Sequence, residues 1–177
     1  MSFKELVNKR QSTRKYKNST IPPELITSCL EAARLAPSAC NAQPWKFIIV
    51  DDAALKSQVG QTAASMGMNK FCLDAPCIVV VVLEKPNVLS AVGSVLKDKE
   101  YALMDIGIAA EHFCLQAEDL GLGTCMIGWF DEKKVQKLLG IPKNKRVPLL
   151  ITVGYADDPP RKKQRKAETE ISSKNRY

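Results

Sequence analysis

The amino-acid sequence predicts an α+β fold in which a central mixed sheet is flanked by helices. The run APCIVVVVLE is apolar and β-branched throughout, which is typical of a central strand covered on both faces. Apolar residues recur at helical spacing over residues 23–36 and 100–120. The chain has 177 residues, of which 45% are hydrophobic, and this is enough for one domain with its own core.

The N-terminal segment contains a helix signal followed by a basic stretch. Ser2 with Glu5 three residues later forms a capping-box pattern, which predicts a short helix that ends near Arg10. The stretch RQSTRKY follows. If this stretch is extended, Arg10, Ser12 and Arg14 point to the same side.

The next elements are marked by prolines and by a change of hydrophobic period. Pro22 and Pro23 suit the first turn of a second helix, which Pro37 ends. Ahead of the central strand, WKFIIVD at 45–51 predicts a strand and ALKSQVGQTAAS at 54–65 predicts a helix.

Residues 100–120 are predicted to form a helix that is apolar around most of its circumference. In so short a chain, we expect this helix to pack against a second subunit as well as its own sheet. Gly121 ends it, and TCMIGWF follows as a short strand or turn. Asp131 and Gly140 then bound another helix, and VPLLITVGYA closes the sheet.

The net charge of +7 is concentrated at the two chain ends. Residues 1–17 contain six Lys or Arg and one Glu, a net +5, and residues 161–177 contain seven Lys or Arg and two Glu, also +5. The body between them carries −3. We expect residues 1–156 to form a single domain and residues 157–177, which are rich in Pro, Lys and Arg, to form a basic arm.

Several classes of protein lack their sequence signals here. No run of 18 apolar residues and no signal-peptide centre occurs, so we expect a cytoplasmic protein without a membrane partner. The six cysteines form no C-x-x-C pair and His112 is the only histidine, so neither a metal site nor a Cys–His nucleophile is predicted. We interpret the cysteines as reduced, buried residues and His112 as a core or interface residue.

Conventional phosphate-binding motifs are also missing. In GLGTCMIG the third glycine position of G-x-G-x-x-G is Met126, and the segment follows a helix where a strand is required. No G-x-x-x-x-G-K-[ST] loop and no G-x-S-x-G occur. RQSTR offers two guanidiniums and a hydroxyl, which suit a phosphomonoester. Taken alone, however, RQSTR is more often a solvated turn, and RKKQRK is typical of a solvated tail.

In order along the chain, R-x-S-x-R, PSACNAQPWKF, DLGLGTCMIGWF and GYADDPPRKKQRK resemble the motifs of the nitroreductase family of flavin (FMN) oxidoreductases. The resemblance extends over nearly the whole chain. It implies a nitroreductase-like homodimer with FMN at the subunit interface, in which the basic arm completes the phosphate site. The residues that would hold the phosphate, the ribityl chain and the pyrimidine edge are Arg10, Gln11, Ser12, Arg14, Lys163 and Arg165.

The same resemblance implies contacts to the flavin ring. The loop residues that would wall the ring from the partner subunit are Pro37, Ser38 and Asn41. Ile127 and Gly128 match the family position under the isoalloxazine, where the Gly128 backbone N–H would donate to flavin N5. A glycine permits such close approach, although a glycine needed for the turn after a strand is the alternative. Asn69 is a candidate beside the pyrimidine edge.

The resemblance also implies an enzymatic activity. Hydride would pass from NAD(P)H through flavin N5 to an electron-poor acceptor of nitroaromatic or quinone type by a ping-pong mechanism, with no catalytic side chain required. Two alternatives remain open: a non-catalytic flavin-binding or carrier protein, and a small basic nucleic-acid-binding module. The latter predicts a basic face with aromatic platforms, and aromatic residues make up only 6% of this chain, so no nucleic-acid partner is expected.

Overall fold

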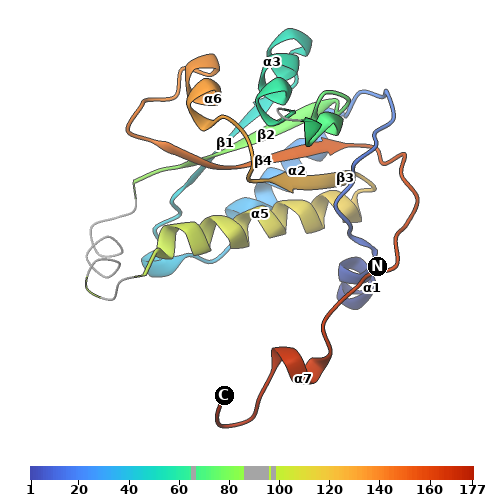
Figure 1. The fold of residues 1–177 in the computed structure, drawn as a ribbon, viewed down its shortest axis with the longest axis vertical. Helices are drawn as coiled ribbons and strands as arrows, with labels where there is room; N and C mark the ends of the chain where they lie inside the picture. The colour runs from blue at the N-terminus through green and yellow to red at the C-terminus, as the bar shows by residue number, and fades with distance from the viewer. Residues whose placement is uncertain (65–66, 86–95, 97–98) are drawn as a thin grey trace.

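The computed structural model describes residues 1–64, 67–85, 96 and 99–177, which form a four-stranded sheet between two layers of helices (Figure 1). The strands are β1 (Trp45–Val50), β2 (Cys77–Leu83), β3 (Gly123–Ile127) and β4 (Arg146–Gly154). Their order across the sheet is β1-β2-β4-β3. The predicted α+β fold is confirmed.

All three strand pairs in this sheet are antiparallel, and this corrects the expected mixed sheet. Parallel pairing in the described residues is confined to an isolated bridge between Ser12 and Thr124. The sequence shows a helix between successive strands, and that alternation is shared with parallel crossover units. The pattern therefore did not distinguish the two arrangements.

The strand β2 is interior to the sheet and buried on both faces, as predicted. Because side chains alternate along a strand, Val79 and Val81 pack in one core and Ile78 and Val80 in another. The first core also contains residues of α2 (Pro23–Arg34) and α5 (Tyr101–Asp119). The second contains residues of α3 (Ala53–Ala63) and α6 (Glu132–Leu138). These are the predicted helices; Ser65, the expected end of one of them, lies outside the described residues.

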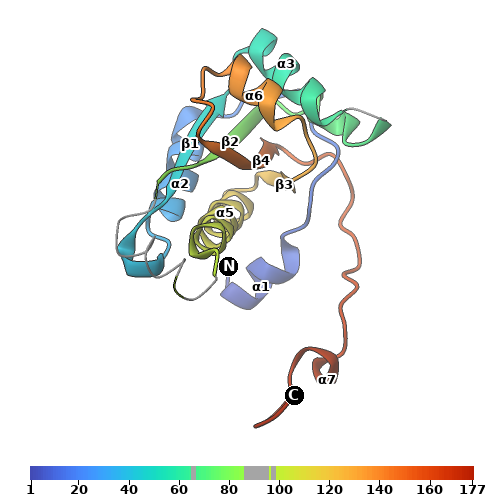
Figure 2. The ribbon, with the colours of Figure 1, turned by 60° about the vertical axis from the view of Figure 1, so that its left-hand side comes forward.

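An extended N-terminal strap, residues 10–17, ties the start of the chain to the sheet. It follows α1 (Phe3–Lys9), which begins at the predicted capping box. The Thr13 N–H donates to the Thr124 carbonyl of β3 at 2.8 Å, and the Lys17 N–H donates to the Tyr155 carbonyl just after β4 at 2.9 Å. The strap therefore crosses one end of the sheet and runs beside the chain that leaves β4 (Figures 1 and 2).

Two glycines that face each other across β3 and β4 make room for the strap. They are Gly123 and Gly154. A Cβ on Gly123 would lie 2.3 Å from Oγ1 of Thr13. A Cβ on Gly154 would lie 2.7 Å from a ring carbon of Tyr16 and 2.6 Å from one of Pro76, outside the strap. All three separations are far below van der Waals contact, so a side chain at either position would displace the strap.

The residues after β4 form an extended and mostly exposed segment with a short helix, α7 (Glu168–Ile171), near its end. Figure 2 shows this segment passing α1 and continuing away from the sheet. Its first part is held by the strap, because the Asp157 N–H donates to the Lys15 carbonyl at 2.9 Å. The two chain ends thus leave the sheet together.

Gly123→Ala should destabilise the fold by about 1–3 kcal/mol, because the added methyl group overlaps Thr13. Urea unfolding measures the free energy of unfolding. In a Thr13→Gly background the overlapping side chain is gone, so the same alanine should be less destabilising, with a coupling of about 1–2 kcal/mol between the positions. Equal losses in both backgrounds would show that the strap does not pack on Gly123.

Candidate functional site

The strap and the start of the basic arm line a cavity of about 430 Å³ that is open to solvent. This volume lies in the range of small-molecule sites. Most of its lining side chains are cationic, and they come from both ends of the chain. The lining residues are Arg10, Gln11, Ser12, Arg14, Arg161, Lys162, Lys163, Gln164 and Arg165.

Carboxylates of α5 fix the N-terminal side of this cationic cavity. The Arg10 guanidinium pairs with Glu111 at 3.0 Å, and the Lys9 ammonium pairs with Glu118 at 3.3 Å. Both carboxylates belong to α5, one near its middle and one near its end. The first residue of the strap is therefore set against the long helix.

The arm docks on the strap through bonds to backbone and amide groups. The Lys163 ammonium donates to the Arg10 carbonyl at 2.5 Å and to a further carbonyl in α1. Arg161 donates its backbone N–H to Oε1 of Gln11 at 2.9 Å and its guanidinium to the Ser12 carbonyl. Each of these bonds joins two residues that are 149 to 156 positions apart in the sequence. The two basic ends of the sequence meet in the fold.

The cations in the cavity repel one another. The pKa of Lys163 is lowered from its ordinary value because burial removes the ammonium from water, and because Arg10 and Arg165 add positive charge beside it. Arg14 is held by its backbone N–H, which donates to Oδ2 of Asp158 at 3.2 Å, while its side chain is exposed to the cavity. An anion in this cavity would relieve the repulsion and gain charge-assisted hydrogen bonds.

The loop that contains Pro37 and Ser38 has an unusual backbone. Cys40, Asn41 and Gln43 have φ of 52°, 51° and 46°, in the left-handed region that residues with side chains rarely adopt. Each such residue costs on the order of 1 kcal/mol. The loop is closed on itself, because the Gln43 N–H donates to the Ser38 hydroxyl at 3.0 Å. Strain concentrated in one short loop is typical of ligand-binding segments.

This loop does not line the cationic cavity of its own chain. It is attached near the start of α5, where Asp105 accepts the Ala39 N–H at 3.1 Å. Glu118, which pairs with Lys9, lies roughly 20 Å further along the helix axis. In Figure 1 the loop lies near the start of α5 and α1 lies near its end, and in Figure 2 α5 lies between them.

The two residues predicted to contact the flavin ring, Ile127 and Gly128, lie at the end of β3. Ile127 is buried, whereas Gly128 is exposed. Gly128 does not have a positive φ, and a Cβ there would meet no described atom within 4 Å. Neither a left-handed turn nor packing in the described chain therefore requires this glycine. Because Ser12 pairs with Thr124, Gly128 lies roughly 13 Å along the extended chain from the strap.

Asn69 lies beside this end of β3. Its Nδ2 donates to the carbonyl of Trp129, the residue after Gly128, at 3.4 Å. Asn69 itself has a left-handed backbone, with φ of 48°. The structure thus brings Asn69 together with Ile127 and Gly128, at the far end of β3 from the cationic cavity.

Three residues of the cavity were not among the predicted ones: Arg161, Lys162 and Gln164. A signal for Arg161 was present. In an extended segment, alternate residues share a side, and Arg161 alternates with Lys163 and Arg165. The same rule that grouped Arg10, Ser12 and Arg14 would have included it.

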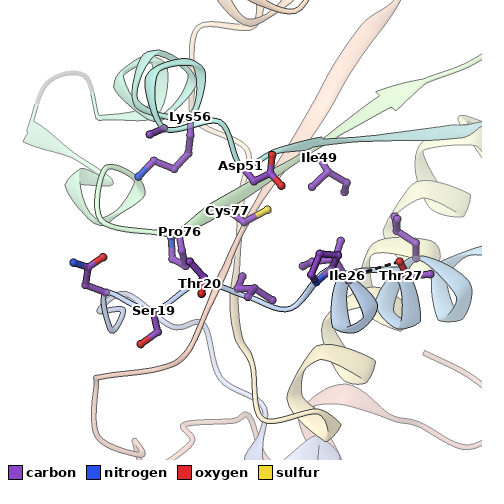
Figure 3. Close-up of a pocket in the computed structure, with 14 residues that line it drawn as sticks. Ser19, Thr20, Ile26, Thr27, Ile49, Asp51, Lys56, Pro76 and Cys77 are labelled. Carbon is purple, nitrogen blue, oxygen red and sulfur yellow. Dashed lines mark hydrogen bonds between the residues drawn. The ribbon is translucent and has the colours of Figure 1, made fainter.

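A larger cavity, of about 590 Å³, lies at the β1 edge of the sheet. Figure 3 shows its lining residues, which come from residues 18–21, α2, the start of α3 and the neighbouring strand ends. Its charged residues are Asp51 and Lys56, of opposite sign, and the Lys56 ammonium donates to the Leu73 carbonyl at 3.1 Å. This cavity lacks the cluster of like charges found between the chain ends, so we assign the candidate site to the cationic cavity.

The buried cysteines are unsuited to nucleophilic chemistry. Burial raises the pKa of Cys29, Cys72, Cys77 and Cys114 to about 12, so these thiols stay protonated at neutral pH. This agrees with their interpretation as reduced, buried residues. Cys40, in the strained loop, is exposed, so the interpretation of all six cysteines as buried residues is wrong for this one. Within the described ranges, none of the helices is long and apolar enough to span a membrane.

The fold and the cavity define an α+β protein that gathers cations from both chain ends around one cavity. The family model described as "Nitroreductase family" matches residues 7–155, and the chain belongs to this family. The family resemblance noted from the sequence motifs is thereby confirmed.

Individual relatives are similar over most of their length. An iodotyrosine deiodinase of Thermotoga neapolitana is 29% identical, with 88% of this chain and 89% of the relative covered. An oxygen-insensitive NADPH nitroreductase of Helicobacter acinonychis is 31% identical, over 85% and 86% of the two chains. The solved structure of an FMN-dependent nitroreductase from Clostridium difficile R20291 has a TM-score of 0.75 and 28% identity, over 97% and 96%.

Inorganic phosphate should stabilise this protein against heat, because the anion reduces repulsion in the cavity. At constant ionic strength the melting temperature should rise with phosphate, and Arg14→Gln should weaken the apparent phosphate affinity by about fivefold or more. Lys143→Gln removes the same charge from an exposed turn and is the matched control. If Arg14→Gln and the wild type respond equally, the cavity is not the anion site.

Proposed function

We propose that this chain is an FMN-dependent NAD(P)H oxidoreductase. Bound flavin would supply the chemistry, taking hydride from NAD(P)H at N5 and passing it to an electron-poor acceptor of nitroaromatic or quinone type in ping-pong turnover. The observation that carries the proposal is the meeting of the two basic chain ends in one cavity. The names of the relatives, an NADPH nitroreductase and an FMN-dependent nitroreductase, support it.

The donor set of the cavity fits the phosphate of FMN. A phosphate monoester carries close to two negative charges at neutral pH and offers several strong acceptor oxygens. Arg10, Arg14 and the Ser12 hydroxyl would supply donors from the domain formed by residues 1–156. Lys163 and Arg165 would supply them from the basic arm, and the Gln11 amide would bind along the ribityl chain and pyrimidine edge. The Glu111 carboxylate would keep the Arg10 guanidinium oriented.

The other end of β3 suits the ring of the same cofactor. The exposed Gly128 has open space where a side chain would be, so a planar group can approach its backbone closely. Its N–H would donate to flavin N5, with Ile127 beneath the ring and Asn69 at the pyrimidine edge. The strap and Gly128 are separated along one strand, which suits an elongated ligand with an anionic end.

The site would be completed by a second copy of the chain. Pro37, Ser38 and Asn41 do not line the cationic cavity of their own chain, and they would wall the ring bound to the other copy. On α5, Met104 and Ile108 lie one turn apart and are 54% and 38% exposed. Large apolar side chains exposed together on a helix are typical of an interface. We therefore propose a homodimer.

Protein reconstituted with FMN should be yellow, and NADH or NADPH should bleach its flavin absorbance under anaerobic conditions. Menadione or a nitroaromatic should then restore the colour over many turnovers. Bound FMN that neither nucleotide reduces would exclude this donor, and reduction without turnover would indicate a carrier protein. A colourless protein whose affinity for oligonucleotides falls steeply with salt would instead indicate a nucleic-acid-binding module.

The substitution Gly128→Ala distinguishes a role of Gly128 in FMN binding from a role in folding. Because the added methyl group meets no described atom, the free energy of unfolding without FMN should change by less than about 0.5 kcal/mol. The same methyl group would crowd a ring against the backbone, so the FMN dissociation constant, measured by fluorescence titration, should rise by about tenfold or more. An unchanged dissociation constant would remove Gly128 from the site.

A further inference from the structure

A buried carboxylate on α5 has no part in the contacts proposed so far. Asp105 is 5% exposed. Its Oδ1 accepts the Ala39 N–H at 3.1 Å, and its Oδ2 is buried without a hydrogen-bond partner among the described residues. A buried carboxylate usually accepts several hydrogen bonds, because its desolvation is costly. Asp105 is therefore a costly residue at this position.

Stability of the helix does not explain this residue. Asp105 lies in the second turn of α5, beyond the first-turn positions whose N–H groups a carboxylate can cap. Its neighbours Ile106 and Ala109 are buried and apolar. An apolar side chain of similar size would pack there with less desolvation.

What Asp105 does bind is the first residue of the 3-10 turn within the strained loop. Ala39 begins the 3-10 turn η1 (Ala39–Asn41), and Cys40 and Asn41 follow with left-handed backbones. The Ser38 hydroxyl does not cap this turn, since it accepts the Gln43 N–H instead. The bond from Asp105 therefore anchors the strained backbone to the long helix.

We infer that Asp105 is a positioning residue, which holds the loop of Ser38 and Asn41 in the conformation that receives the flavin. This inference rests on the proposed function, because the loop is assigned there to the ring of the cofactor. The carboxylate acts through the Ala39 N–H and does not itself touch the ring. The strain of Cys40 and Asn41 is sustained by that bond.

The test compares Asp105→Asn with Asp105→Leu, two residues of similar size of which only asparagine keeps an oxygen for the Ala39 N–H. Hydrogen exchange of the Ala39 amide is measured without FMN, and the FMN dissociation constant is measured by fluorescence. In the leucine variant we expect exchange and the dissociation constant each to rise about tenfold, as for one lost charged hydrogen bond. In the asparagine variant both should stay within about twofold of the wild type. Asp119→Leu, at the exposed end of α5, is the matched control.

A second variant removes the donor of this hydrogen bond, the Ala39 N–H, and leaves the sequence of α5 unchanged. Ala39→Pro has no N–H to donate, and proline is favoured at the first position of a helical turn. It should weaken FMN binding as much as Asp105→Leu, and the double variant should be no weaker than either single one. If Asp105→Leu does not fold, the Ala39→Pro variant alone tests whether the bond positions the loop.

The outcomes separate the inference from the proposed function. Unchanged Ala39 exchange in Asp105→Leu, or faster exchange with unchanged FMN affinity, would overturn the role of Asp105 while FMN binding by the wild type stands. Additive losses in the double variant would also overturn it. A wild type that binds no FMN would overturn the proposed function and this role together.

Discussion

The backbone pairing of the strap with the sheet is the contact on which the remaining structure of the site depends. Two chain ends that each carry a net charge of +5 are brought together, although their charges repel. Hydrogen bonds from Thr13 to Thr124 and from Lys17 to Tyr155 hold them, and the buried Tyr16 hydroxyl, 2.7 Å from that of Thr152, adds a tertiary contact. The facing pair Gly123 and Gly154 allows this close approach. The cationic cavity is thus a consequence of how tightly one end of the sheet is crossed.

Three of the four carboxylates on the long helix α5 each bind a group outside the helix. Asp105 binds the strained loop, Glu111 binds the Arg10 guanidinium and Glu118 binds the ammonium of Lys9. Between them the helix buries Phe113 and its neighbours against the sheet. A helix that is mostly apolar therefore also serves as the rigid spacer between the loop and the strap, and this spacing suits a site shared by two copies of the chain.

Local signals in the sequence were sufficient for most elements of the fold. The capping box at Ser2, the prolines before α2 and the apolar run of β2 each act within a few residues, so they are visible without a structure. The strand directions were not visible, because α3 and α6 lead to neighbouring strands in a pattern that parallel crossovers share. Asp105 gave no signal, since a single acidic residue in a helical pattern is usually on a solvated face. Arg161 was missed although it alternates with Lys163 and Arg165, because the run RKKQRK was interpreted as a solvated tail.

The crossing of the sheet by the strap has a consequence for how the protein is made. Residues 10–17 leave the ribosome early, yet their hydrogen-bonding partners in β3 and after β4 are among the later residues to be synthesised. During translation, the cations of residues 10–17 have no strand to pack against until β3 and β4 have been synthesised. The cations of the basic arm are synthesised later still. A chain that stops after residue 160 would contain every residue of both hydrophobic cores but would lack the five cavity-lining residues from Arg161 to Arg165.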